Sequence, residues 1–268
     1  MLAAFDEQMR RHPVPGPGVR VETEERVTRT VGTDGSWSAV VWSDLSEADA
    51  DEVIAAEVAR SCGPLEWKLY AHDRPADLPE RLRAAGLTPE PVETLMVAEI
   101  ADLELPVPAP DGVRLATVED DAGVETVLRV HLDVFGSVHP GTGTAVRASL
   151  GLRPRPIEAV LAWAGGVPVS AGRIEFHEGT EFASLWGGGT LPDWRGRGVF
   201  RALVGHRAVL ARDRGFRYLE VDAMPTSRPI LQRMGFQPLT LTTPWMYGSE
   251  SDAAAAGSLF PSSAQDGS

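Results

Sequence analysis

The chain has 268 residues, 43% of them hydrophobic, and a formal net charge of −13, so it can form one large or two small folded domains. The negative charge argues against nucleic acid or an anionic membrane as a partner, and no apolar run reaches membrane-spanning length. The single cysteine, Cys62, cannot form an internal disulfide, and residues 1–11 lack the apolar core of a signal peptide, so we expect a cytoplasmic protein. Lys68 is the sole lysine among 25 lysines and arginines, a bias typical of high-GC bacterial genomes.

The first half of the chain predicts strands that alternate with helices. Residues 1–12 favour a short helix, because Leu2, Phe5 and Met9 fall on one face. Ser46 is a favourable N-cap for the next helix. The expected elements are strands at 27–31, 37–42, 65–72 and 93–100, helices at 46–60 and 77–85, and a proline-rich linker at 102–111.

The second half begins with a predicted strand at 113–117 and a helix at 119–135. A hairpin turns at Gly165-Gly166, and a disordered tail is expected over 249–268. Between these lie a loop at 136–144, a helix at 144–152, hairpin strands at 156–165 and 167–176, a strand at 183–190, a helix from Val199, a strand at 216–222, a helix at 227–234 and strands to Tyr247. The pattern as a whole predicts an α/β (α+β) fold with mixed sheets flanked by helices.

A glycine- and arginine-rich loop joins the predicted strand at 183–190 to the helix that follows. It contains Arg195, Gly196, Arg197 and Gly198. The first N–H groups of a helix have no partner within it and lie at the positive end of its dipole, so this loop predicts an anion site. Arg201 stands where a dinucleotide-binding loop needs its third glycine, and no Lys-Ser/Thr pair follows the last glycine as in a P-loop, so both of those motifs are excluded.

The two halves of the chain also align with each other at a single offset. Gly86 and Gly235, like Pro89 and Pro238, stand 149 residues apart, and these residues mark the ends of helices and the starts of turns. We interpret this as a duplicated strand–helix–strand–helix–strand unit. The alternative is two unrelated segments whose turns coincide.

The first copy of the proposed repeat lacks the features of the anion loop. Ser46, Glu47, Ala48 and Asp49 stand opposite Arg195, Gly196, Arg197 and Gly198. Carboxylates at these positions repel a phosphate. We therefore expect the first half to be a degenerate copy that binds no cofactor.

The second half resembles the GCN5-related N-acetyltransferase (GNAT) superfamily in its element order and in its loop. The family loop reads Arg/Gln-x-x-Gly-x-Gly/Ala; Arg195 and Gly198 fit it, whereas Phe200 replaces the last small residue. The resemblance implies tandem GNAT-like domains: a degenerate one at 1–105 and an acetyltransferase domain at 106–248, before the tail at 249–268.

The resemblance implies acetyl-CoA as the cosubstrate, bound where the parallel strands 183–190 and 216–222 separate. The pantetheine then pairs with the first of these strands, and the diphosphate lies on the loop. The residues assigned to cofactor binding are Gly189, Thr190, Leu191, Arg195, Gly196, Arg197, Gly198, Val199, Phe200, Arg201 and Ser227.

The catalytic groups follow less directly from the sequence. Acyl transfer needs a base for the amine, a donor for the oxyanion and an acid for the thiolate. Many family members use a Tyr of the last helix as the acid, but Leu231 occupies that position. We assign Glu175 as the base and Tyr218 as the acid, with His177 as the alternative base and Tyr247 as the alternative acid. Without a catalytic role, Glu175 would pair with Arg173 or another surface arginine, and Tyr218 would belong to the core.

The predicted activity is direct transfer of an acetyl group to the primary amine of a small molecule or a peptide, by a monomer or homodimer without bound metal. The alternative is an acyl-CoA-binding regulatory protein with little turnover, consistent with Leu231 at the usual Tyr position.

Overall fold

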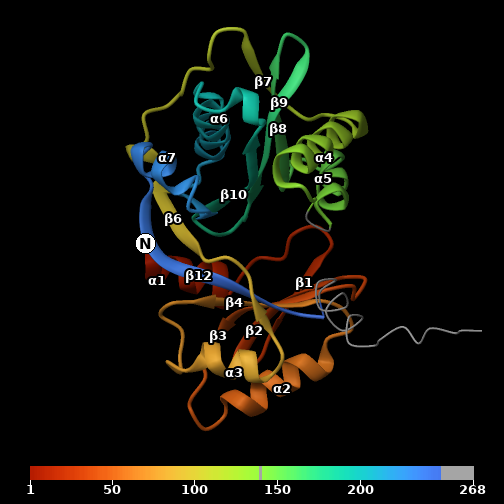
Figure 1. Cartoon of the computed structure of the whole chain (residues 1–268), viewed down its shortest axis with the longest axis vertical. Coiled ribbons are helices and arrows are strands. Elements are labelled where there is room, and N and C mark those ends of the chain that lie inside the picture. Colours follow the sequence, from red (N-terminus) through yellow and green to blue (C-terminus); the bar gives the residue numbers. More distant parts are fainter. Residues whose placement is uncertain (139–140, 249–268) are drawn as a thin grey trace, which may run out of the picture. The chain divides into compact units, whose positions relative to one another are not determined.

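The computed structural model describes residues 1–138 and 141–248 (Figure 1) and divides the chain into two compact units. The first unit consists of Met1–Val19 and Glu93–Thr242, and the second of Arg20–Val92 and the described residues 243–248. The tail predicted at 249–268 lies outside the described residues. Within them, none of the helices combines the length and apolar character needed to cross a membrane.

The first unit is built on a mixed sheet whose strands lie in the order β12-β6-β11-β10-β9-β8-β7. Strands β10 and β11 pair in parallel, and the other neighbours in this row are antiparallel. The strands are β12 (Gln237–Tyr247), β6 (Glu93–Glu99), β11 (Tyr218–Ala223), β10 (Phe182–Thr190), β9 (Val167–Phe176), β8 (Ile157–Ala164) and β7 (Val113–Thr117). The predicted mixed α/β architecture is confirmed.

Helices cover both faces of this sheet. The valines of α4 and α5 pack on Ile157, Ala159 and Leu161 of β8, whereas α6 packs on the opposite face with Ile174 and Leu185. The helical segments are α1 (Leu2–Phe5), the π-helix η1 (Asp6–Arg11), the 3-10 turns η2 (Ile100–Asp102) and η3 (Pro192–Trp194), α4 (Asp121–Phe135), α5 (Thr142–Leu150), α6 (Val199–Asp213) and α7 (Arg228–Arg233).

The second unit repeats this plan on a smaller scale. Strands β3 and β4 pair in parallel, and α2 and α3 pack on a core around Val40, Ile54, Trp67 and Leu82. Its elements are β1 (Val19–Thr23), β2 (Val27–Gly32), β3 (Ser38–Ser43), α2 (Ala50–Arg60), β4 (Leu65–Tyr70), α3 (Leu78–Ala84) and β5 (Thr88–Pro89), with the end of β12.

The predicted repeat is confirmed in the order of its elements. The series β3-α2-β4-α3-β6 matches β10-α6-β11-α7-β12, and each series contains one parallel strand pair. The first residues of α2 and α6, Ala50 and Val199, are 149 residues apart, but those of β3 and β10, Ser38 and Phe182, are 144 apart. The gapless alignment therefore holds for the helices and not for every strand.

The structure divides the chain differently from the predicted boundary at residue 105. Strand β6 pairs with β11 and with β12, and its Leu95, Met96 and Val97 are fully buried. The sequence assigns β6 to the first half because it follows α3 directly. Strand pairing between segments more than a hundred residues apart leaves no local signal, so the boundary could not be read from the pattern.

The predicted cap of the second helix needs correction. Helix α2 begins at Ala50 with Asp49 as its N-cap, not at Ser46. The carboxylate Oδ1 of Asp49 accepts a hydrogen bond of 2.7 Å from the backbone N–H of Ser46. The side chain of Asp49 thus bonds a backbone N–H group of the loop that precedes the helix. Residues 46–49, which the sequence predicts as helix, form this loop.

Candidate active site

The loop between β10 and α6 has the geometry of an anion site. Gly196 and Gly198 adopt left-handed backbone conformations, with φ of +74° and +85°, which glycine accepts without a steric penalty. Gly198 is the N-cap of α6, and among the residues that the structure describes no side chain caps this end of the helix. The first-turn N–H groups, including those of Val199 and Phe200, are therefore available to an anion at the positive end of the helix dipole.

Arginines and a packed tryptophan complete the loop. The Nε–H of Arg195 donates to the carbonyl oxygen of Thr190 at 3.0 Å, which ties the loop to the end of β10. The guanidinium of Arg197 lies 4.9 Å from the ring centroid of Trp194. Trp194 in turn packs against a buried apolar cluster that contains Val199, so the loop is anchored on both sides and keeps its cationic character.

Strands β10 and β11 pair over a short distance only. Their parallel register runs from Phe182 opposite Tyr218 to Ser184 opposite Glu220. Beyond Ser184, β10 still pairs with β9, and β11 still pairs with β6. The expected separation of the two strands thus begins at Ser184, upstream of the loop.

The run Gly187–Gly188–Gly189 lies in an irregular part of β10, where the register with β9 shifts between Trp186 and Gly189. Helices press on its backbone from both faces. A Cβ at Gly187 would lie 2.8 Å from Cε1 of His131, and one at Gly189 would lie 2.7 Å from Val134. On the other face, a Cβ at Gly188 would lie 3.2 Å from the ring of Phe200. The glycines are therefore required by the close approach of α4 and α6.

The predicted residues at the end of β10 are held by buried hydroxyl groups. Ser170 Oγ donates to the carbonyl oxygen of Gly189 at 2.6 Å and lies 2.9 Å from Thr190 Oγ1. The N–H of Leu191 donates to Val169 of β9 at 2.9 Å. Because the peptide groups of a strand point alternately to its two sides, the N–H of Thr190 faces away from β9.

Glu175 lies on β9, opposite Ser184 of β10. It accepts a hydrogen bond of 2.7 Å from Nε of Arg173, so the ion pair weighed as the alternative is present. The neighbouring residues on this face form a chain of contacts: Trp186 Nε1 donates to Ser184 Oγ at 2.9 Å, and that oxygen lies 2.7 Å from His177 Nε2. Burial lowers the pKa of His177.

Tyr218 lies at the opposite end of the sheet from the loop. It is the first residue of β11 and is buried against Phe182, with ring centroids 4.9 Å apart. The loop follows the C-terminal end of β10, and β11 runs parallel to β10. Residue 223, at the end of β11, therefore lies toward the loop, whereas residue 218, at its start, lies away from it.

The last helix offers no acid either. Ser227 is the N-cap of α7, and its hydroxyl donates to the carbonyl oxygen of Met224 at 3.2 Å. Leu231 is 1% exposed in the core.

The sequence reasoning missed two buried polar side chains beside the glycine run. His131 of α4 is 4% exposed, and its Nε2 has no hydrogen-bond partner among the described residues. Burial, aided by the charge of Arg173, lowers the pKa of His131 to about 4, although a hydrogen bond to the Gly187 backbone opposes the shift. The available signal was a histidine in line with the buried valines of its helix.

Arg207 of α6 is the second of these side chains. It is 1% exposed and donates to the carbonyl oxygens of Arg173 at 2.9 Å and of Trp186 at 3.4 Å. Burial lowers its pKa to about 9. Arg207 therefore ties α6 to the irregular part of β10.

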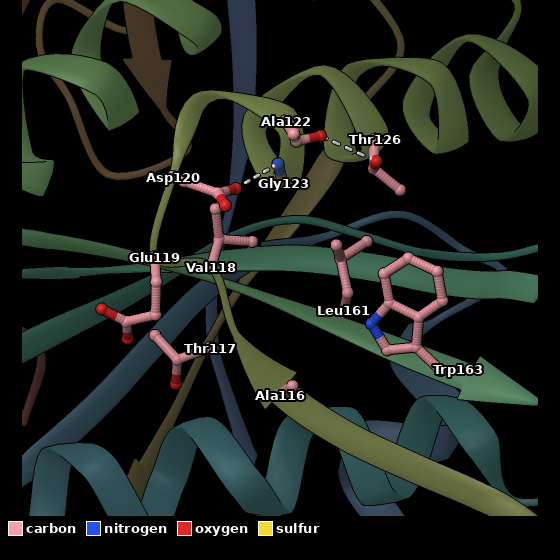
Figure 2. A pocket seen from close by; sticks show the side chains of 10 residues that line it. All are labelled: Ala116, Thr117, Val118, Glu119, Asp120, Ala122, Gly123, Thr126, Leu161 and Trp163. Atoms are coloured by element: carbon pink, nitrogen blue, oxygen red, sulfur yellow. Dashed lines mark hydrogen bonds between the residues drawn. The ribbon is translucent and has the colours of Figure 1, made fainter. Parts of the chain in front are cut away.

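This unit contains a cavity beside α4 and another beside α6. One of about 350 Å³ lies under the start of α4 (Figure 2), where Asp120 caps the helix and Thr126 donates to Ala122, so these polar groups are already bonded. The other, of about 480 Å³, is lined by residues 102–108 together with Arg201 and Arg233, and it adjoins the loop through Arg201. Across residues 1–138 and 141–248, no group of three or more His, Cys, Asp or Glu side chains could hold a metal ion.

Comparisons with known proteins agree with this geometry. Residues 125–236 match the family model described as the acetyltransferase (GNAT) family. No curated protein sequence matches the chain.

Several solved structures share the fold over most of the chain. A GCN5-related N-acetyltransferase from Kribbella flavida is 19% identical with a TM-score of 0.66, over 89% of this chain and 93% of its own. A functionally unknown conserved protein from Staphylococcus epidermidis is 15% identical with a TM-score of 0.64, over 91% of this chain and 97% of its own. A tandem GNAT protein from the clavulanic acid biosynthesis pathway is 14% identical with a TM-score of 0.56, over 87% and 84%. The chain thus has a fold of two GNAT-like units, and residues 125–236 match the model of the acetyltransferase (GNAT) family.

Proposed function

We propose that this protein transfers an acetyl group from acetyl-CoA directly to the primary amine of a small molecule or a peptide. The match of residues 125–236 to the GNAT family model supports acyl-CoA-dependent acetyl transfer in general. The observation that carries the proposal is the uncapped N-terminus of α6, preceded by two left-handed glycines and flanked by Arg195, Arg197 and Arg201. This arrangement suits a diphosphate, since it combines exposed N–H groups with guanidinium charge.

On one side of the loop, the pantetheine arm of the cofactor can lie along β10. On the other side, its nucleotide end can lie in the cavity lined by Arg201 and Arg233. The outward N–H of Thr190 and the carbonyl groups near it are positioned to pair with the amide groups of a pantetheine arm. In the other direction, Arg201 and Arg233 line the cavity beside the loop and supply two cations for the nucleotide end.

The reaction joins the amine nitrogen to the acetyl carbon. The neutral amine attacks the thioester carbonyl, the C–N bond forms, the C–S bond breaks, and one hydrogen of the amine ends on the coenzyme A sulfur. Backbone N–H groups of the irregular Gly187–Leu191 stretch are suited to stabilise the oxyanion. Glu175 remains a candidate to accept the proton through water, although it must first leave its bond with Arg173.

Charge reversal in the loop tests the cofactor site. Arg197→Glu removes a cation from the loop and adds an anion, so we expect acetyl-CoA affinity to fall by about tenfold or more. Arg212→Glu makes the same change at the far end of α6, where Arg212 is half exposed and contacts Asp213, and should leave the affinity within about twofold. Calorimetric titration measures both, and equal affinities in the two variants would remove the loop from the cofactor site.

Turnover separates an enzyme from a binding module. Thiol release from acetyl-CoA, measured with a panel of small amines and peptides, should rise with at least one of them. Binding without thiol release under any condition would favour the regulatory acyl-CoA-binding alternative.

A further inference from the structure

The imidazole of His131, on α4, packs directly against the irregular part of β10. A Cβ at Gly187 would lie 2.8 Å from its Cε1 and 3.0 Å from its Nε2. Gly187 also has a φ of +58°, and only glycine accepts both this conformation and this contact without strain. The fold thus accommodates an imidazole in direct contact with the β10 backbone.

The hydrogen bonding of this imidazole is incomplete. A hydrogen bond to the backbone of Gly187 holds the ring, while Nε2 is buried without a partner among the described residues. Because Nε2 has no partner within the described part of the chain, we assign the ring proton to Nδ1, and in this tautomer Nε2 carries the free lone pair. Burial of a polar atom without a partner is unfavourable, so this one is a candidate for contact with a ligand.

The surroundings keep the ring neutral. Arg173 and Arg207 both disfavour a second positive charge next to them, and burial acts in the same direction. The ring of Phe135 packs edge-on against the imidazole, with centroids 5.8 Å apart, and is itself 52% exposed. Nε2 is thus a fixed hydrogen-bond acceptor behind an aromatic ring that faces solvent.

We propose that Nε2 of His131 accepts a hydrogen bond from the attacking amine and holds its nitrogen over the Gly187–Gly189 backbone. This inference rests on the proposed function, because the backbone beneath the ring is the one assigned to the acyl group. His131 orients the nucleophile and keeps its lone pair directed at the carbonyl. The hydrogen that the amine loses still ends on the coenzyme A sulfur, so the ring is unchanged after each cycle.

Two amide variants separate this role from a structural one. In His131→Asn the amide lies where Nδ1 does and can keep the bond to Gly187, but no acceptor remains at the Nε2 position. In His131→Gln the amide extends to the Nε2 position. The probe is hydroxylamine, a nucleophile small enough to reach any acceptor site, and the readout is hydroxylamine-dependent thiol release from acetyl-CoA by the full chain.

We expect His131→Asn to lose about tenfold or more in this rate, the equivalent of one hydrogen bond, and His131→Gln to stay within about threefold of the wild type. Coenzyme A affinity and the thermal unfolding midpoint should change little in either. Equal rates in all three proteins, or rescue by Asn and not by Gln, would overturn the inference, as would a wild type that binds coenzyme A without any hydroxylamine-dependent release. Failure of the wild type to bind coenzyme A would instead remove the proposed function.

Discussion

Gly187 has a left-handed backbone conformation, and the imidazole of His131 packs closely against it. Gly187→Ala introduces a strained φ, which costs about 1–2 kcal/mol, and also displaces the imidazole of His131, whose Cε1 lies 2.8 Å from the new methyl group. We expect a total loss of about 2–4 kcal/mol in the free energy of unfolding, together with loss of thiol release.

Gly165→Ala is the matched control for backbone strain. Gly165 has a φ of +55°, and a Cβ there would meet nothing within 4 Å. In this variant the free energy of unfolding should fall only by the cost of the strained backbone, and the activity should be kept. Chemical denaturation measures the free energy of unfolding of both variants. Equal losses would show that the contact with His131 does not contribute to the cost of Gly187→Ala.

The pH dependence of stability should contain a contribution from His131. Burial lowers its pKa to about 4 from the ordinary histidine value of about 6.5, so the unfolded chain binds more protons between these values. The free energy of unfolding therefore rises with pH through this window. The contribution of His131 reaches its full value above the window and is at most about 3 kcal/mol. Burial lowers the pKa of His177 and His206 as well, and both act in the same direction.

Comparison of urea midpoints at pH 5 and pH 7.5 measures this contribution. The wild type should lose more stability at pH 5 than His131→Asn does, because the variant has no imidazole to protonate. An identical pH difference in both proteins would contradict the buried, neutral state of His131.

At the scale of elements, the strand–loop–helix of residues 182–213 could be predicted because all its parts are local. Two glycines, three arginines and an apolar helix follow one another directly in the chain, and each acts where it stands. His131 could not be assigned in the same way. Its contact with Gly187 depends on how α4 packs on β10, which helical periodicity indicates only as an inward-facing side.

The corresponding element of the second unit shows why the loop sequence matters. There Asp49 accepts the hydrogen bond of the Ser46 N–H and also contacts Arg26 at 3.3 Å. The bond from Ser46 lowers the pKa of Asp49. Asp49 thus stands at the N-cap of α2, as Gly198 does at the N-cap of α6, and its negative charge disfavours a phosphate at the start of α2.

At the scale of the whole molecule, the sequence predicts the repeated order of elements but not the unit to which β6 belongs. Burying a large apolar side chain contributes about 1.5–3 kcal/mol, and β6 supplies Leu95, Met96 and Val97 to the interior of the first unit. A fragment of residues 106–248 lacks this strand and leaves the edge of β11 unpaired.

We therefore expect the 106–248 fragment to aggregate or to show no cooperative thermal transition. A fragment of residues 93–248 differs only by β6 and the linker, and should be the more soluble and more ordered of the two. Circular dichroism during heating makes the comparison. A cooperative transition at the same temperature in both fragments would contradict the role assigned to β6.

A crystal structure of the full chain with coenzyme A tests the central claim most directly. The account predicts one molecule per chain, with its diphosphate on the N–H groups of Gly196 to Arg201 and its sulfur near Gly187 and the imidazole of His131. Diphosphate density on the loop that precedes α2, or on a surface away from α6, would contradict it.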